Sequence, residues 1–271
     1  MSGKYGKQTW HLIDRGHRGR NAGSSRVVSI DGQEKAESVT LEGGKSISAD
    51  MVLVSIGARP SVDLAKAAGL RITDKGSIWV DDYMRTSADD IFAVGDCALK
   101  RDFFTRREVP VWLTSTATAE ARNAGTNLYG IRVMNQIQGT ISAFSTKIGN
   151  VSFASTGMTF RTCQKEGFRN VSATCEAPDR HPGTLPDAHK LKVKLVFADR
   201  SGILLGGQIS GSPSAGELIN TVALAIQKKV TVRELGMMQI ATHPMLTSAP
   251  TVHPLVNAAH QALAKMRASH K

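Results

Sequence analysis

The chain has 271 residues, of which 41% are hydrophobic and 21% are charged, as in a globular protein that buries a sizeable core. No apolar run approaches the roughly 18 residues of a transmembrane helix, and residues 1–11 lack the apolar core of a signal peptide, so we expect a cytoplasmic protein without a membrane partner. The net charge of +11 by itself suggests nucleic-acid binding. However, much of the excess positive charge lies in residues 1–26, and the aromatic residues, at 5%, do not alternate with basic ones. We therefore expect no nucleic-acid partner.

Residues 1–25 show no hydrophobic period, and we treat them as an atypical basic tail, for which disorder is one interpretation. The pattern sharpens after this tail. Val27–Ile30 and Ser38–Leu41 are short runs rich in β-forming residues, and residues 42–45 supply a turn that leads to Ile47. These runs predict a small set of antiparallel strands.

A continuous apolar run, Met51–Ile56, predicts a strand that is buried on both faces. Asp63–Ala68 predicts a short helix, which Gly69 would stop in the left-handed conformation. The next predicted elements are strands over Ile78–Val80 and Ile91–Val94 and a helix over Leu113–Tyr129, followed by Gly130.

The pattern changes after Gly139. Leu191–Phe197 alternates apolar with polar residues and turns through 198–202 into Ile203–Ile209, which predicts an antiparallel hairpin. Further strands are predicted over Val151–Thr156 and Val171–Cys175, and helices over Ala215–Gln227, Val232–Met237 and Pro254–Met266. Strands followed by helices indicate a separate α+β domain, so we divide the chain into 1–25, 26–135 and 136–271.

Three cysteines lie far apart in the sequence, at Cys97, Cys163 and Cys175. They form no C-x-x-C pair, which argues against a disulfide scaffold, a zinc site and a redox dithiol within this chain. His253 and His260 have no further metal-ligand residues near them in sequence, and we interpret them as structural. We therefore expect no metal site.

The end of the predicted strand at Ile91–Val94 carries the strongest functional signal. Gly95 and Asp96 follow this apolar run directly. Glycine allows a backbone to approach a ligand, and a carboxylate accepts hydrogen bonds from hydroxyl groups. The structural alternative is that the pair only forms a turn and caps a helix.

Several segments together resemble the FAD-dependent pyridine nucleotide-disulfide oxidoreductases, and in particular their coenzyme A-disulfide reductase and NADH oxidase branch. The resemblance extends from about residue 26 to the C-terminus. The segments that carry it are Ala49–Pro60 (junction strand), Thr86–Ala98 (second FAD motif), Leu113–Gly130 (the helix after that motif), and Gly206–Gln208 with Ala215–Asn220 (dimerisation domain).

This resemblance implies a fold in two parts: an α/β remnant of an FAD-binding domain, followed by an α+β dimerisation domain with an antiparallel sheet and helices. It covers only the later half of a family member. The G-x-G-x-x-G loop for the FAD pyrophosphate, the redox cysteine and the glycine motif for NAD(P)H are missing from this sequence. Whether the isolated chain is an enzyme is therefore uncertain, and we expect its own FAD binding to be weak or absent.

The resemblance also implies roles for individual residues. Gly95 and Asp96 would contact the ribityl chain of FAD, and Ser115, Thr116 and Ala117 would begin a helix aimed at the isoalloxazine ring. His243, which precedes a proline, would be the catalytic histidine that reaches the cysteine of a neighbouring subunit. The structural alternative for His243 is a histidine that caps a loop before the proline.

We thus expect the C-terminal portion of an FAD-dependent NAD(P)H oxidoreductase that acts on a disulfide, a persulfide or oxygen. The chain would supply the ribityl contact and the interface of a homodimer, and NAD(P)H would serve the complete enzyme. One alternative is a catalytically inactive, truncated reductase that serves as a dimerisation or interaction module. The other is a basic nucleic-acid binder, whose affinity would fall steeply with salt.

Overall fold

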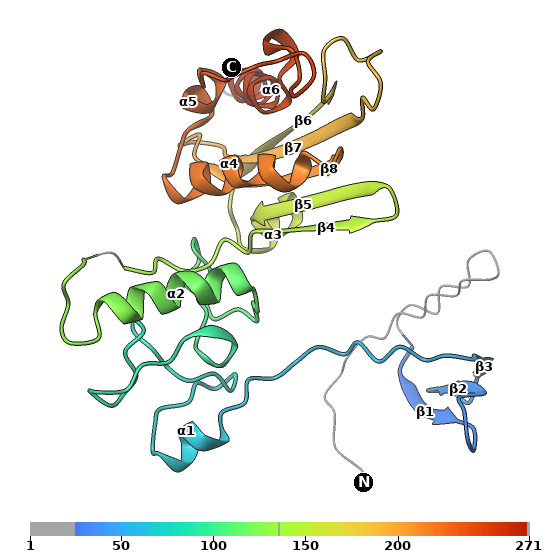
Figure 1. Ribbon diagram of the computed structural model, residues 1–271, viewed down its shortest axis with the longest axis vertical. Helices are drawn as coiled ribbons and strands as arrows, with labels where there is room; N and C mark the ends of the chain where they lie inside the picture. Colours follow the sequence, from blue (N-terminus) through green and yellow to red (C-terminus); the bar gives the residue numbers. More distant parts are fainter. Residues whose placement is uncertain (1–24, 135, 270–271) are drawn as a thin grey trace. The chain divides into compact units, whose positions relative to one another are not determined.

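The computed structural model describes residues 25–134 and 136–269 (Figure 1). Apart from residue 25, the predicted basic tail lies outside the described residues. The chain divides into two compact units, Met1–Arg59 and Pro60–Lys271, which are described separately below. The predicted division near residue 135 stays a prediction.

The first unit contains a small antiparallel sheet in the order β1-β2-β3, as predicted. Its strands are β1 (Val27–Asp31), β2 (Ser38–Leu41) and β3 (Ser46–Ser48). Gly43 and Gly44 both have positive φ angles, +96° and +81°, in the turn between β2 and β3. Glycine adopts this left-handed conformation without steric cost, which explains why the turn forms here.

The prediction for Met51–Ile56 is wrong, because this run forms no strand and is largely exposed. The side chains of Met51 and Leu53 are 84% and 87% exposed. A strand buried on both faces needs a hydrogen-bonded neighbour along its edges and layers on both sides. The part of the chain that the structure describes supplies no neighbouring strand for this run.

The second unit opens with α1 (Asp63–Ala67), which ends near Gly69 in the left-handed conformation, as predicted. The strands predicted over Ile78–Val80 and Ile91–Val94 are wrong. Their residues make isolated bridges, such as Arg85 with Phe92, instead of continuous ladders. Apart from Ile91, which is exposed, their apolar side chains nevertheless pack into one cluster with Val62 and Ala124. The apolar pattern therefore predicts burial better than it predicts secondary structure.

Helix α2 (Thr114–Thr126) forms where a helix was predicted but ends three residues early. The side chain of Asn127 explains this end. Its Oδ1 accepts hydrogen bonds from the backbone N–H groups of Arg132 (2.9 Å) and Val133 (3.0 Å). These bonds hold the following chain in a loop, because a side-chain amide that bonds nearby backbone competes with the helical ladder.

The C-terminal part of this unit is a five-stranded antiparallel sheet in the order β4-β5-β8-β7-β6. The predicted hairpin is confirmed as β7 and β8. Strand β4 was not predicted, because all five of its residues are exposed and carry no alternating pattern. The strands are β4 (Phe144–Ile148), β5 (Val151–Gly157), β6 (Asn170–Pro178), β7 (Lys190–Ala198) and β8 (Leu204–Gly211).

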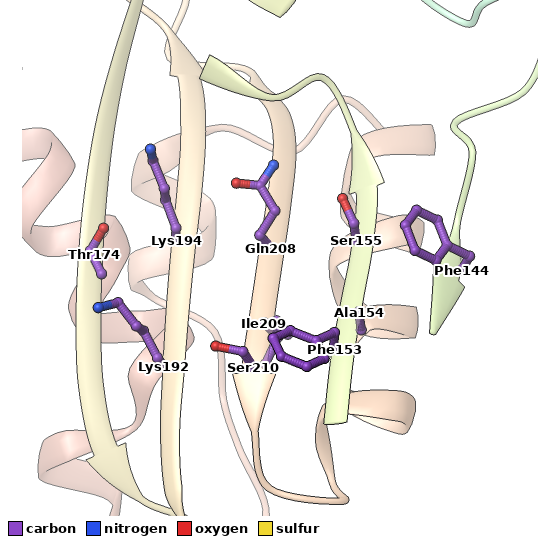
Figure 2. Close-up of a pocket in the computed structure, with 10 residues that line it drawn as sticks. All are labelled: Phe144, Phe153, Ala154, Ser155, Thr174, Lys192, Lys194, Gln208, Ile209 and Ser210. Carbon is purple, nitrogen blue, oxygen red and sulfur yellow. The ribbon is translucent and has the colours of Figure 1, made fainter. Parts of the chain in front are cut away.

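Two helices cover one face of this sheet, and Figure 2 shows the sheet from its other side with helices behind it. Helix α4 packs on β4, β5 and β8, and α6 packs on β6 and β7. The helices are α3 (Phe160–Lys165), α4 (Ala215–Gln227), α5 (Val232–Gly236) and α6 (Pro254–Ser269), with single 3-10 turns η1 (Gly95–Cys97) and η2 (Pro250–Val252). The expected α+β domain, an antiparallel sheet with helices, is therefore confirmed.

The core of this sheet lies between it and α4 and α6. Leu195, Phe197, Ile226 and Leu255 are fully buried there. Within the described residues, no helix is both long enough and apolar enough to cross a membrane.

An acidic residue on the face of the large sheet opposite α4 and α6 makes a testable contribution to stability at low pH. Glu176 lies between Lys190 (3.0 Å) and Lys192 (2.8 Å), and hydrogen bonds from these lysines, together with their charge, lower its pKa to about 2. A carboxyl pKa that is lower in the folded state stabilises the fold above the unfolded value, about 4.5, and this contribution disappears as pH falls toward 2. We expect Glu176→Gln to flatten the loss of stability across that window in urea unfolding. An unchanged pH profile would contradict this assignment.

Candidate functional site

The predicted ligand-binding turn forms at Gly95 and Asp96. It follows Val94, whose backbone is extended (φ −138°, ψ 163°). Gly95 has φ +77°, a conformation that side chains with a Cβ rarely adopt. A Cβ placed on Gly95 would lie 3.8 Å from Cβ of Ala117. The structure therefore brings the predicted turn and the predicted helix start together.

The carboxylate of Asp96 is available for a ligand. The residue is exposed, and it accepts no hydrogen bond from the residues in 25–134 and 136–269. Gly95 and Asp96 do form a turn, as in the structural alternative, but Asp96 caps no helix, because neither η1 nor α2 has a side-chain cap. An unpaired exposed carboxylate is an acceptor for hydroxyl groups.

The first turn of α2 lies beside Gly95. Ser115 is exposed, and Thr116 and Ala117 are half-buried. The Oγ1 atom of Thr116 lies 3.5 Å from Oγ1 of Thr140. The residue before the helix, Leu113, gives no side-chain cap, so the first N–H groups of α2 lack intrahelical acceptors. A helix start of this kind favours negative charge.

A buried ion pair, which the sequence analysis did not identify, lies directly behind the turn. Oε2 of Glu120 accepts hydrogen bonds from the N–H of Gly95 (2.9 Å) and from Nζ of Lys100 (2.9 Å). Lys100 Nζ also donates to the carbonyl oxygens of Gly95 and Ala98. The two charged side chains are only 4% and 2% exposed. One signal was present in the sequence: Glu120 interrupts the alanine-rich face formed by Ala117 and Ala124.

The structure places His243 in the loop between α5 and α6, where its side chain is exposed. The ring is fixed by a local turn: Nδ1 accepts a hydrogen bond from the N–H of Met245 (3.2 Å), and the His243 N–H donates to Oγ1 of Thr247 (3.1 Å). Because Nδ1 is an acceptor, the proton of the neutral ring is assigned to Nε2.

The end of strand β6 holds the His243 loop. The N–H of His181 donates to the carbonyl of Pro244 (3.0 Å), and Oγ of Ser248 donates to the carbonyl of Pro178 (2.5 Å). Asp179 lies between these bonds, is buried, and accepts hydrogen bonds from Ser212 and from the N–H of His189. Within the described residues, no hydrogen bond or ion pair links His243 to the Gly95 turn.

A groove of about 370 Å³ lies on the face of the large sheet opposite α4 and α6 (Figure 2). None of the predicted site residues lines it. Its lysines are already engaged: Lys192 pairs with Glu176, and Nζ of Lys194 lies 5.4 Å from the ring centroid of Phe160. The ten lining residues are Phe144, Phe153, Ala154, Ser155, Thr174, Lys192, Lys194, Gln208, Ile209 and Ser210.

The cysteines and the helix histidine do not form a second reactive site. All three thiols are free, and burial raises the pKa of Cys163 to about 11 and also raises the pKa of Cys175. Burial lowers the pKa of His253, whose Nδ1 has no hydrogen-bond partner. Among the described residues there is no cluster of three or more side chains that could hold a metal ion.

Comparisons with known proteins agree with this architecture. The model of the pyridine nucleotide-disulphide oxidoreductase family matches residues 23–124, and the model of the dimerisation domain of the same family matches residues 143–253. The NADH oxidase of Methanocaldococcus jannaschii is 32% identical over 244 residues, which are 90% of this chain and 52% of that protein. The NAD(P)H coenzyme A polysulfide/persulfide reductase of Pyrococcus horikoshii is 30% identical over 85% of this chain and 50% of its own length.

A solved structure gives the same result. The NAD-dependent persulfide reductase from A. fulgidus superposes with a TM-score of 0.81 at 29% identity, over 90% of this chain and 44% of that chain. The chain thus spans about half the length of the curated relatives that it matches. Two consecutive domain matches, together with sequence and structural similarity across both, show that the chain belongs to the pyridine nucleotide-disulphide oxidoreductase family.

Proposed function

We propose that this chain supplies the flavin-contacting turn and the dimer interface of an FAD-dependent NAD(P)H oxidoreductase that acts on a disulfide, a persulfide or oxygen. The family is FAD- and NAD(P)H-dependent. The observation that carries the proposal is the Gly95–Asp96 turn, which lies against the first turn of α2. The free, buried cysteines fit a reducing compartment such as the cytoplasm.

The residues at this turn fit the ribityl chain and ring of FAD. Asp96 offers a carboxylate that no protein group uses, and Gly95 has no side chain to block a close approach. The N–H groups at Ser115, Thr116 and Ala117 begin a helix without a side-chain cap. Such a helix start stabilises negative charge on a bound ring.

When bound, FAD would accept hydride from NAD(P)H and pass electrons to the acceptor. In this assignment Asp96 holds a ribityl hydroxyl through its carboxylate, and Gly95 lets the backbone approach the same chain. The first turn of α2 orients the ring and stabilises its charge. This chain thereby provides one wall of the flavin site.

His243 takes the catalytic role in this proposal, through its Nε2 atom. With Nδ1 engaged by Met245, the neutral ring presents an Nε2–H that donates a hydrogen bond to the thiolate of a neighbouring subunit. To receive a thiol proton at Nε2, the ring must carry its own proton on Nδ1 instead, which requires release of the Met245 N–H. Both steps are compatible with an exposed loop.

The dimer forms through the C-terminal domain. Its sequence matches the dimerisation domain of the family, and strands β4 and β5 leave large apolar side chains uncovered. Phe144, Ile148, Val151 and Phe153 are between 40% and 68% exposed. Groups of exposed apolar side chains mark interaction surfaces, and most soluble oligomers are symmetric homo-oligomers.

Asp96→Ala tests the flavin contact. We expect the full chain to bind added FAD weakly, as measured by quenching of flavin fluorescence. Loss of a hydrogen bond to a charged group costs about 1.5–3 kcal/mol, so affinity should fall by roughly 10- to 100-fold. Asp90→Asn is the matched control, because Asp90 is exposed and close in sequence but lies outside the turn. Equal affinity of Asp96→Ala and the unmodified chain would contradict the assignment.

One observation favours the interaction module as a second candidate function. The sheet of the C-terminal domain packs its own hydrophobic core against α4 and α6. The visible absorption spectrum of the purified protein and sedimentation in the analytical ultracentrifuge separate the two functions. A colourless dimer that does not quench added FAD would support the module, and flavin binding that depends on Asp96 would support the oxidoreductase.

A further inference from the structure

We propose that Lys100 and Glu120 are positioning residues of the flavin turn, and that their buried ion pair fixes the Gly95 peptide groups so that Asp96 stays directed to the ligand. This inference rests on the proposed function, because flavin is the ligand for which the turn would be held. Neither residue touches the ligand in this assignment. Both act through Gly95.

The pair holds Gly95 from both sides of the residue. Glu120 accepts the N–H of Gly95 (2.9 Å), and Lys100 donates to the Gly95 carbonyl and to the carbonyl of Ala98 (3.1 Å). The ion pair itself (2.9 Å) joins the two side chains. Since Gly95 has φ +77° and lacks a Cβ, its own sterics restrict it little. The two charged side chains therefore supply the restraint that a side chain at residue 95 would otherwise give.

Stability alone does not explain a buried pair at this position. A buried ion pair is often no more stabilising than apolar residues of similar volume, because both charges lose their hydration. Removal of one partner is costly, because the other charge is then buried and unpaired. The surroundings here are apolar, with Ala93, Ala98, Leu99 and Ala124 buried in one cluster. Apolar side chains would fit this environment, but they would leave the N–H of Gly95 without a partner and its carbonyl with only the N–H of Ala98.

The cavity beside the pair argues against direct ligand binding by these residues. It measures about 10 Å³ and is lined by Lys100 and Glu120 together with Thr140 and Gly139, among others. This volume has room for one water molecule at most. The pair is thus connected to the site only through the backbone of the turn.

The decisive test compares single variants with a double apolar variant in the full chain. Glu120→Ala and Lys100→Met should each destabilise the protein, because each leaves one buried charge. The double variant Lys100→Met/Glu120→Leu removes both charges and should regain most of the stability in urea. If the pair positions the turn, the double variant should still have a loosened turn, which separates positioning from stability.

Cys97 reports directly on the turn and does not depend on flavin. It is half-buried, and its Sγ donates to the carbonyl of Val94 (3.5 Å). Cys163 and Cys175 are buried and report global unfolding in the same sample. We expect the thiol of Cys97 to react with an aromatic disulfide reagent about tenfold faster in the double variant, while Cys163 and Cys175 stay protected. Mass spectrometry of the labelled peptides assigns each site.

Val62→Ala provides the control for stability. Val62 belongs to the same apolar cluster as Ala93 and Ala98 but makes no hydrogen bond to the turn through its side chain. At matched stability we expect its Cys97 to react as in the unmodified chain. The double variant should also lower the affinity for FAD by about tenfold, a loss equal to roughly one hydrogen bond.

The outcomes separate this inference from the proposed function. Unchanged Cys97 reactivity and unchanged FAD affinity in the double variant would overturn the positioning role. Unchanged FAD affinity in Asp96→Ala would overturn the flavin assignment instead, and the thiol measurement would still decide whether the ion pair holds the turn. Faster Cys97 labelling together with weaker FAD binding supports the inference.

Discussion

Replacement of Gly206 by alanine should destabilise the second unit by about 3 kcal/mol or more. Gly206 lies in β8 between Gly157 of β5 and Val196 of β7. A Cβ at this position would lie 2.0 Å from the carbonyl oxygen and 2.7 Å from the nitrogen of Met158. These are backbone atoms at the end of a paired strand, so they cannot move without breaking the ladder. Urea unfolding followed by circular dichroism measures the change.

Gly216→Ala is the matched control in the same domain. Gly216 lies in the first turn of α4, and the nearest atom to its added Cβ is Oγ of Ser145 at 3.8 Å, an ordinary contact. Alanine is favoured over glycine in a helix by roughly 0.5–1 kcal/mol, so this variant should be neutral or slightly more stable. A Gly206→Ala protein that unfolds at the same urea concentration as this control would show that the sheet relaxes around the methyl group.

The sequence predicts the C-terminal domain well because its elements bury one face against each other. Ala215–Gln227 was predicted with the bounds that α4 has, and Leu191–Phe197 shows the alternation of a strand with one covered face. These patterns are clear because the residues that form this core all belong to one continuous stretch of the chain. In such a case the local hydrophobic period and the final packing agree.

The elements that failed depend on neighbours that the described residues do not provide. Met51–Ile56 has the composition of a central strand, but a strand exists only through hydrogen bonds to another strand. Residues 92–94 pack their apolar side chains, but the segment pairs only through an isolated bridge. The amino-acid composition of a segment indicates whether it prefers a buried environment. Whether the segment becomes a strand depends on backbone hydrogen bonds to a neighbouring strand.

The candidate site shows the same difference between residues that a local pattern predicts and residues whose role depends on distant contacts. Gly95 and Asp96 could be singled out because a short apolar run ends in a residue that tolerates positive φ and a residue that binds hydroxyl groups. Glu120 shows only one signal in the sequence, its place on the alanine-rich face of α2, and Lys100 shows none, because the two side chains pair with each other and with backbone atoms of Gly95, which lies 25 residues before Glu120. Charged residues are rarely buried without a partner, so a sequence pattern assigns them to the surface. Their role becomes visible only in the fold.

Replacement of Phe197 by alanine should cost about 3–5 kcal/mol. Phe197 is fully buried in β7, and the register between β7 and β8 shifts between Val196 and Phe197. Successive side chains of a strand point to opposite faces of the sheet, so both residues are buried: Val196 belongs to a small cluster with Cys163, and Phe197 belongs to the main core. The unpaired residue at this register shift lies in β8, so Phe197 keeps the face that Leu195 has.

The loss of stability in Phe197→Ala should be near the upper end of this range, because the cavity left by the phenylalanine ring cannot collapse. Strand β7 is hydrogen-bonded on both sides, to β6 and to β8, so neither neighbour can move inward. Phe144→Ala is the matched control, because Phe144 lies in β4 and is 48% exposed; at protein concentrations where the chain is monomeric, loss of the Phe144 ring should cost less than about 1 kcal/mol. Since β6 anchors the His243 loop through Pro178, Phe197→Ala should also expose that loop to proteolysis at lower urea concentrations. If both phenylalanine variants unfold together, Phe197 does not fill the core as the structure indicates.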